Sequence, residues 1–294
     1  MLEHLSALSD EAGDSCQEQI RAIERVGLKF LDLRAMDGFN VSVLPEERAR
    51  RIRSQLDAAG LQVAMFGSPI GKIDLADDMQ GDLDKLRHLG KLADILGCRR
   101  VRIFSYYNRK AKLPQKEFRR QVLDRLGQLK QLAAKLRLTL YIENEMGIFG
   151  EKCGEMELLA RTFRDGADGV VRLIFDFDNY NVARENVWEN WLKLREVTDA
   201  FHLKDSVWAD DQTLYHVPVG QGQGAVKKIL ADAVRRGWTG PLTVEPHLQH
   251  SAAVLATGTS GAANATYAKM PAAESFYIAC QAAKELLQSV NTGQ

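Results

Sequence analysis

Four potential metal ligands stand where apolar runs end in the second half of the chain. They are Glu143 in LTLYIENE, Asp176 in RLIFDFDN, His202 in DAFHLKD and Glu245 in PLTVEPH. A carboxylate at the end of a buried strand is costly to desolvate unless it is paired or coordinated. Three acids that converge on one place would repel one another, and a divalent cation removes that repulsion. The pattern therefore predicts one divalent ion bound by these four residues.

The chemistry of the ligands limits the choice of metal. Three carboxylates and one imidazole suit Mn²⁺, Mg²⁺ or Co²⁺, and Zn²⁺ accepts the same ligands. Manganese is our first choice. For a single acid, a helix cap or an ion pair with a nearby Lys or Arg would be the simpler interpretation. Four ligand residues in succession favour a shared metal site instead.

Neighbours of the ligands are candidates for contact with a substrate. Side chains two residues apart point to the same face of a strand. The residues related to the four ligands in this way are Glu145, Asp178, Lys204 and His247. Of these, Lys204 and His247 are predicted to bind substrate. Lys204 could stabilise a developing enolate oxygen or bind a phosphate, and a salt bridge to Asp205 or Glu245 is the alternative.

Strand-like runs recur along the whole chain, and each is followed by a segment with helical spacing of apolar residues. This alternation is typical of βα units with a parallel sheet. The predicted strands cover residues 4–8, 29–33, 62–66, 100–104, 138–143, 171–176, 200–204 and 242–245. The clearest helical stripes lie in residues 20–26, 83–96, 123–136 and 276–287, and Gly27 and Gly97 stand at the C-cap positions of the first two.

Eight such units predict an α/β protein with a single (β/α)8 TIM barrel over residues 1–294. No break in composition divides the chain, and a doubly wound open sheet is the alternative. The carboxyl ends of barrel strands carry the active site in this fold, so the four ligands would lie on one rim. Residues 251–269 are rich in Ala, Gly, Ser and Thr, which predicts a flexible loop, either disordered or a flap over the site.

Two loops hold weaker candidates. Lys72 follows the third predicted strand in GSPIGKI and is a predicted substrate contact, with a solvated lysine as the alternative. VGQGQG at 219–224 lacks the strand, turn and helix setting of a dinucleotide-binding loop. It could contact an anion of the substrate at a helix N-terminus, or serve as a flexible connection.

Composition excludes several classes of partner. Lys+Arg and Asp+Glu both total 39, so no net field attracts nucleic acid or an anionic membrane. No stretch approaches the roughly 18 to 20 apolar residues of a membrane span, and no signal peptide is evident. The four cysteines are widely spaced, which favours reduced, buried thiols. We expect a cytoplasmic protein with a small-molecule partner, and a homo-oligomer is possible.

The quoted segments resemble the xylose-isomerase-like superfamily of TIM barrels, which includes sugar phosphate isomerases/epimerases, tagatose and psicose 3-epimerases, hydroxypyruvate isomerase, inosose dehydratase and endonuclease IV. The segments that carry the resemblance are GSPIGKI (67–73), YIENEMGIFG (141–150), FDFDNYN (175–181), FHLKD (201–205), VGQGQG (219–224) and LTVEPHL (242–248). The resemblance implies metal ligation by two glutamates, an aspartate and a histidine, which fall on Glu143, Glu245, Asp176 and His202. It also implies that the two glutamates are the acid-base pair.

The chain departs from the epimerase pattern at three positions that contact substrate there. Phe149 stands in place of a second glutamate, Asn179 in place of a histidine and Trp208 in place of an arginine. Asn179 and Trp208 are nevertheless predicted substrate contacts, and Trp208 could stack on a sugar face. Endonuclease IV carries additional zinc-binding histidines, and the only histidines here besides His202 are His4, His88, His216, His247 and His250, so a three-metal site for DNA repair is not expected.

These features predict a metal-dependent isomerase or epimerase of a sugar, sugar phosphate or polyol in carbohydrate metabolism. The metal would chelate a carbonyl and a neighbouring hydroxyl oxygen, and Glu143 and Glu245 would remove and return a C–H proton through an enediolate. One alternative is a metal-dependent lyase or dehydratase of a keto-sugar or keto-inositol. The other is a barrel that binds a metal and a sugar without catalysis.

Overall fold

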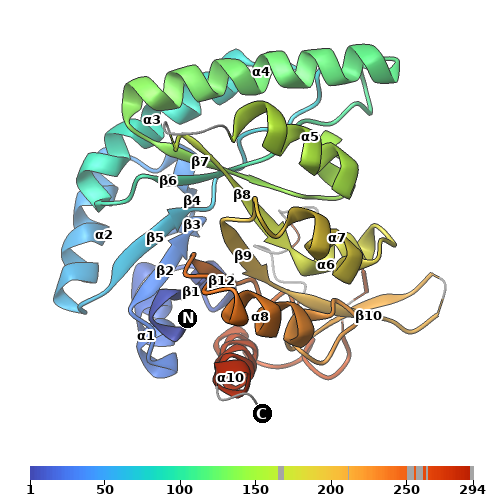
Figure 1. Cartoon of the computed structure of the whole chain (residues 1–294). Coiled ribbons are helices and arrows are strands. Elements are labelled where there is room, and N and C mark those ends of the chain that lie inside the picture. The colour runs from blue at the N-terminus through green and yellow to red at the C-terminus, as the bar shows by residue number, and fades with distance from the viewer. Residues whose placement is uncertain (165–168, 211, 250–254, 256–260, 263, 292–294) are drawn as a thin grey trace.

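The computed structural model describes the chain except for residues 165–168, 211, 250–254, 256–260, 263 and 292–294. Eight parallel strands form a nearly closed barrel, and helices surround it (Figure 1). The strands are β1 (Leu5–Ala7), β2 (Phe30–Leu33), β5 (Gln62–Phe66), β6 (Arg100–Ile103), β7 (Thr139–Glu143), β8 (Val171–Asp176), β9 (Ala200–Leu203) and β12 (Leu242–Val244). The bounds of each strand agree with the prediction to within one residue.

The strand order β1-β12-β9-β8-β7-β6-β5-β2 runs once around the barrel. β1 and β2 stand at the two ends of this order, and a parallel bridge between Leu8 and Asp32 joins them. Closure removes the free edges that an open sheet would expose. The fold is therefore the predicted (β/α)8 barrel, and the open-sheet alternative is wrong.

Each barrel strand is followed by a helix that packs an apolar stripe against the barrel. The main helices are α1 (Cys16–Val26), α2 (Glu46–Ala58), α3 (Gln80–Leu96), α4 (Gln115–Leu136), α5 (Cys153–Phe163), α7 (Val187–Leu194), α8 (Val226–Arg235) and α10 (Ala272–Asn291). Gly27 and Gly97 end α1 and α3 with φ of 75° and 71°, in the left-handed region that glycine adopts at little cost. Both predicted C-caps are thus confirmed.

Additional elements at the carboxyl ends of the strands shape the rim. A short helix, α6 (Phe177–Val182), begins directly after β8, and a hairpin of β10 (Asp205–Trp208) and β11 (Leu214–Val217) begins directly after β9. The β10 strand extends outward from the barrel beside α6 (Figure 1). A smaller hairpin, β3 (Ala35–Met36) and β4 (Phe39–Asn40), follows β2.

Three further expectations concern the chain as a whole. The four cysteines are buried free thiols, as predicted. Among the described residues, every helix is too short or too polar to cross a membrane. The predicted flexible loop at 251–269 lies largely outside the described residues, so this interpretation stays a prediction.

Candidate metal centre

The structure brings the four sequence-predicted ligands together at the carboxyl end of the barrel. Glu143 and Asp176 are the last residues of β7 and β8, and Glu245 follows β12 directly. His202 lies in β9 and pairs in register with Asp176 of the neighbouring strand. All four side chains are buried, and one potential ligand atom from each lies within 4.8 Å of those of the others. Parallel strands that end at one rim thus produce the predicted convergence.

Oppositely charged groups are interleaved within this cluster. The Nδ1 atom of His202 lies 2.7 Å from Oε1 of Glu143 and 3.3 Å from Oε2 of Glu245. The ammonium of Lys204 lies 3.3 Å from Oδ2 of Asp176 and 3.7 Å from Oε2 of Glu245. One histidine and one lysine therefore stand among three acids, and the alternative expectation of a salt bridge between Lys204 and Glu245 is also realised.

Several buried atoms of the cluster have no hydrogen-bond partner among the described residues. They are Oε2 of Glu143, Oδ2 of Asp176, Oε2 of Glu245 and both ring nitrogens of His202. The short contact between His202 and Glu143 is an ion-pair distance without hydrogen-bond geometry. Buried polar atoms without partners are rare because each costs about 1–3 kcal/mol. Three carboxylate oxygens and an imidazole form a donor set that fits a divalent ion.

Burial and neighbouring charges shift the pKa values of the ligands in different directions. Burial alone would lower the pKa of His202, but Glu143 and Glu245 outweigh it and raise this pKa to about 10. Burial disfavours the charged form of Glu245, yet Lys204 helps to hold its pKa well below the ordinary value. Burial raises the pKa of Asp176 well above its ordinary value, although Lys204 opposes the shift. Asp176 is therefore the ligand whose charged form burial disfavours most clearly.

Asp176 combines two roles that looked like alternatives in the sequence. Its Oδ1 accepts a hydrogen bond of 2.8 Å from the backbone amide of Asn179 and caps α6. Its Oδ2 is the oxygen that has no hydrogen-bond partner. The side chain of Asn144 fixes the end of β8, because it accepts from the Asp176 amide at 2.8 Å and donates to the Asp176 carbonyl at 3.0 Å. A helix cap at this position therefore leaves one oxygen for a metal.

Four of the predicted substrate contacts line one pocket with Glu143 and Glu245; these four are Lys72, Asn179, Lys204 and His247. The Nζ of Lys72 lies 2.6 Å from Oε2 of Glu145 and 4.4 Å from the ring centroid of Phe104, so it is not the solvated lysine of the alternative. Asn179 accepts a 3.1 Å hydrogen bond from Lys204. The pocket lining is mostly polar and carries both signs of charge.

Trp208, the fifth predicted substrate contact, is not among the residues that line this pocket. It ends β10, its indole N–H donates to the carbonyl of Asn181 at 3.1 Å, and the guanidinium of Arg184 lies 3.3 Å from its ring centroid. The chain leaves the barrel after Lys204 to form the outer hairpin, and the sequence pattern did not reveal this departure. The structure gives no support to stacking of Trp208 on a substrate in the pocket.

The glycine-rich loop at 219–224 binds a carboxylate of the chain itself. The backbone amides of Gly220, Gly222 and Gly224 donate to Asp205 at 3.0, 2.9 and 3.0 Å. A Cβ on Gly222 would stand 2.1 Å from Oδ1 of Asp205, which explains the glycine there. These amides are therefore not available to an anion of the substrate, and the interpretation of the loop as a substrate contact is wrong.

Replacing Asp205 with alanine should lower the free energy of unfolding by at least about 1 kcal/mol, because three amides lose their common acceptor and a buried donor left unsatisfied, here the amide of Gly224, costs about 1–3 kcal/mol. Asp205→Asn keeps one carbonyl oxygen and should lose less. Denaturation in urea measures the difference. Asp124→Ala removes an exposed aspartate of α4 and serves as the matched control. Equal stability of the Asp205→Ala and Asp124→Ala proteins would contradict this account of the loop.

The sequence analysis missed several buried residues around the ligands. The guanidinium of Arg34 lies 2.7 Å from Asp10, 3.2 Å from Glu11 and 3.4 Å from Glu245. Glu11 in turn lies 2.9 Å from Nδ1 of His247. The position of Arg34 directly after the second predicted strand was a usable signal. Asp10 and Glu11 lie two and three residues after the end of the first predicted strand.

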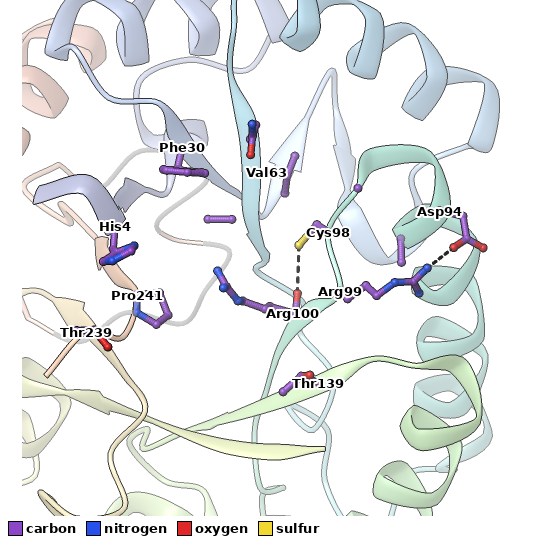
Figure 2. Close-up of a pocket in the computed structure, with 14 residues that line it drawn as sticks. His4, Phe30, Val63, Asp94, Cys98, Arg99, Arg100, Thr139, Thr239 and Pro241 are labelled. Atoms are coloured by element: carbon purple, nitrogen blue, oxygen red, sulfur yellow. Dashed lines mark hydrogen bonds and ion pairs between the residues drawn. The ribbon is translucent and has the colours of Figure 1, made fainter. Parts of the chain in front are cut away.

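A larger cavity of about 700 Å³ lies at the opposite end of the barrel (Figure 2). Its lining includes Phe30, Gln62, Arg100 and Thr139, which are the first residues of β2, β5, β6 and β7. Figure 2 shows the side chains of Phe30, Arg100 and Thr139 around one opening. Both groups of acids and histidines that could hold a metal in the described residues lie at the other end. Sites of barrel enzymes lie at the carboxyl end, so size does not make this cavity the active site.

Comparison with known families agrees with the fold. A family model described as xylose isomerase-like TIM barrel matches residues 20–264. The chain belongs to this family. The resemblance in the sequence is thereby confirmed. No curated protein sequence matches the chain significantly.

Solved structures of this xylose isomerase-like barrel family share the fold at low identity. One is the IOLI protein with a bound zinc atom, 14% identical, with a TM-score of 0.73 and coverage of 98% of this chain and 99% of that chain. Another is L-ribulose 3-epimerase, 14% identical, with a TM-score of 0.71 and coverage of 98% and 96%. A third is the probable 3-DHS dehydratase AsbF from Bacillus anthracis, 15% identical, with a TM-score of 0.70 and coverage of 95% and 97%.

Proposed function

We propose that this protein is a metal-dependent isomerase or epimerase that acts on a sugar, a sugar phosphate or a related polyol, with Mn²⁺ as the preferred ion. One observation carries the proposal. Four buried ligand residues from the ends of β7, β8, β9 and β12 keep five polar atoms without hydrogen-bond partners among the described residues. Structural neighbours that are an epimerase and a zinc-bound barrel support the reaction class and the metal.

The proposed mechanism uses the two glutamates to move a proton. Glu143 and Glu245 belong to the four proposed metal ligands and also act as the acid-base pair. One of them takes the proton from the carbon beside a substrate carbonyl, and the other returns a proton to the enediolate. A divalent ion bound by Glu143, Asp176, His202 and Glu245 would supply Lewis-acid polarisation of that carbonyl. Lys204, held by Asn179 at 3.1 Å, orients its ammonium toward the same pocket and can stabilise negative charge on a substrate oxygen.

Proton exchange with solvent tests the reaction class. The protein loaded with Mn²⁺ is incubated in D₂O with L-ribulose, 3-keto-D-glucose and 2-keto-myo-inositol, three compounds that each have a C–H beside a carbonyl. We expect deuterium at that carbon of at least one compound, measured by proton NMR. Protein stripped with a chelator should give none. The absence of exchange in all three with the loaded protein would contradict the proposal.

The metal content itself gives a separate prediction. Protein purified without chelator should hold one divalent ion per chain, because one atom from each of the four ligand residues converges within 4.8 Å. Elemental analysis measures both stoichiometry and identity, and a predominance of zinc would correct the preference for manganese. A preparation that holds no ion and takes up none on dialysis against Mn²⁺ would remove the basis of the proposed function.

A further inference from the structure

The cavity of about 700 Å³ at the amino-terminal ends of the strands opens into the barrel interior. Side chains two residues apart point to the same face of a strand. Arg100 and Thr139, which line the cavity, lie two residues before Arg102 and Tyr141, and both of these later side chains are buried. Branched apolar side chains usually fill the interior of such a barrel in layers. Here the first layer contains polar side chains and leaves space between them.

A buried apolar layer separates this cavity from the pocket of the proposed metal ligands. Four side chains form a cluster apart from the main core: Met65, Tyr141, Ile174 and Ala200. They come from β5, β7, β8 and β9, and since β5 and β9 are not neighbours in the sheet, the cluster spans the barrel interior. On β7, Tyr141 stands between Thr139 of the cavity and Glu143 of the pocket. The cavity is therefore a separate compartment, and its volume lies within the range of about 300–1,000 Å³ that is usual for small-molecule sites.

Two arginines line the cavity, and they differ in their partners. Arg99 lies 2.5 Å from Asp94, which is the only acidic residue of the lining. The guanidinium of Arg100 has no ion pair and no hydrogen bond with the residues that the structure describes. Figure 2 shows Arg99 directed toward Asp94 and Arg100 directed into the opening. Arg100 therefore presents a permanent positive charge to the cavity, and no carboxylate of the lining neutralises it.

Apolar side chains surround the guanidinium of Arg100. Phe30, Val63 and Pro241 belong to the lining, and Figure 2 shows all three around the same opening. The ring of Phe30 is only partly buried and belongs to neither hydrophobic cluster of the described residues. An apolar wall with a few directed polar groups is typical of sites that bind small organic molecules. The wall formed by Phe30, Val63 and Pro241 fits a ring or another compact apolar group.

We propose that this cavity binds a small carboxylic acid with a ring, in its ionised form. The carboxylate accepts hydrogen bonds from the guanidinium of Arg100, whose planar shape matches two carboxylate oxygens. The ring lies against the wall of Phe30, Val63 and Pro241. A monoanion is favoured over a phosphate ester, because Arg100 supplies one permanent charge whereas a phosphate group carries about −1.5 to −2 at pH 7. The site is independent of the proposed function and lies at the opposite end of the barrel.

Benzoate and benzamide test the proposal, because they have nearly the same shape and only benzoate is charged. Isothermal titration of the protein loaded with Mn²⁺ measures both affinities. We expect benzoate to bind at least about tenfold more tightly than benzamide, since a hydrogen bond to a charged partner is the stronger one. Arg100→Met should weaken benzoate by about tenfold and leave benzamide unchanged. Arg99→Met removes the neighbouring arginine, whose charge Asp94 already neutralises, and serves as the matched control; its affinity for benzoate should be that of the native protein.

Several results would overturn the proposal. Native protein that binds no benzoate, or binds benzamide equally well, excludes recognition of a carboxylate, and this comparison needs no variant. Full affinity for benzoate in Arg100→Met would place the bound molecule elsewhere, for instance at the metal ligands. Equal losses in Arg99→Met and Arg100→Met would indicate a general effect of charge rather than a contact with Arg100. Circular dichroism and metal content show whether each variant is folded. Proton exchange with keto compounds is measured separately, so failure of this proposal leaves the proposed function intact.

Discussion

Replacing His202 with alanine should weaken binding of Mn²⁺ by at least about 100-fold, since even partners outside the ligand set change metal affinity by about 10- to 100-fold. His202 supplies the imidazole of the set and is 1% exposed at the centre of the cluster. Without it, Glu143 and Glu245 lose the group that lies 2.7 and 3.3 Å from them. Isothermal titration with Mn²⁺ measures the affinity, and proton exchange in D₂O should fall with metal content.

The control is His4→Ala, which removes an exposed histidine far from the cluster and should leave metal binding unchanged. A His202→Ala protein that is folded by circular dichroism and keeps its full metal content would remove His202 from the ligand set. In that event the neutralisation of Asp176 and Glu245 would be assigned to Lys204, because its ammonium lies 3.3 and 3.7 Å from their carboxylates.

The ligand cluster could be predicted from the sequence because all strands of a parallel barrel end at the same rim. Residues at the carboxyl ends of different strands therefore lie close together in space. An apolar run that ends in Glu143 or Asp176 predicts both a strand and the place of its last side chain. The same reasoning places Lys204 and His247 at the pocket, where both are found. Register between neighbouring strands, as between Asp176 and His202, then brings the side chains together.

The part of the site that could not be predicted lies in segments outside the regular alternation of strands and helices. In such segments the spacing of apolar residues does not show where the chain turns or which side chains meet. His216 lines the pocket, where its Nε2 lies 3.0 Å from Oδ2 of Asp178 of α6. It lies 14 residues after His202 (216 − 202) in the β10–β11 hairpin, and no spacing rule connects it to Asp178. The position of Trp208 could not be predicted for the same reason, because the hairpin directs its indole N–H to the carbonyl of Asn181. The sequence likewise did not show that Asp205 accepts the hydrogen bonds of the glycine-rich loop.

The largest effects on turnover are expected from Glu245→Gln and Glu143→Gln. Each substitution keeps the approximate shape of the side chain but removes the carboxylate that takes a proton. Turnover of a keto-sugar should fall by about 10²- to 10⁴-fold, the range for loss of a general base, or further where metal binding also suffers. Glu189→Gln on the exposed face of α7 is the matched control and should be silent. Metal content is measured for all three proteins.

Solvent exchange then distinguishes a proton-transfer role from a ligand role. The native protein should place deuterium beside the carbonyl in D₂O, and a Glu→Gln variant that retains its metal should lose most or all of this exchange. Since an epimerase that uses two bases needs each of them on one face of the substrate, one variant should still exchange slowly from the face served by the remaining glutamate. If a substrate is converted without any exchange, a shielded proton or a hydride shift is the explanation. If both variants keep their metal and full activity, Glu143 and Glu245 are ligands only, and another group in the pocket must carry the proton.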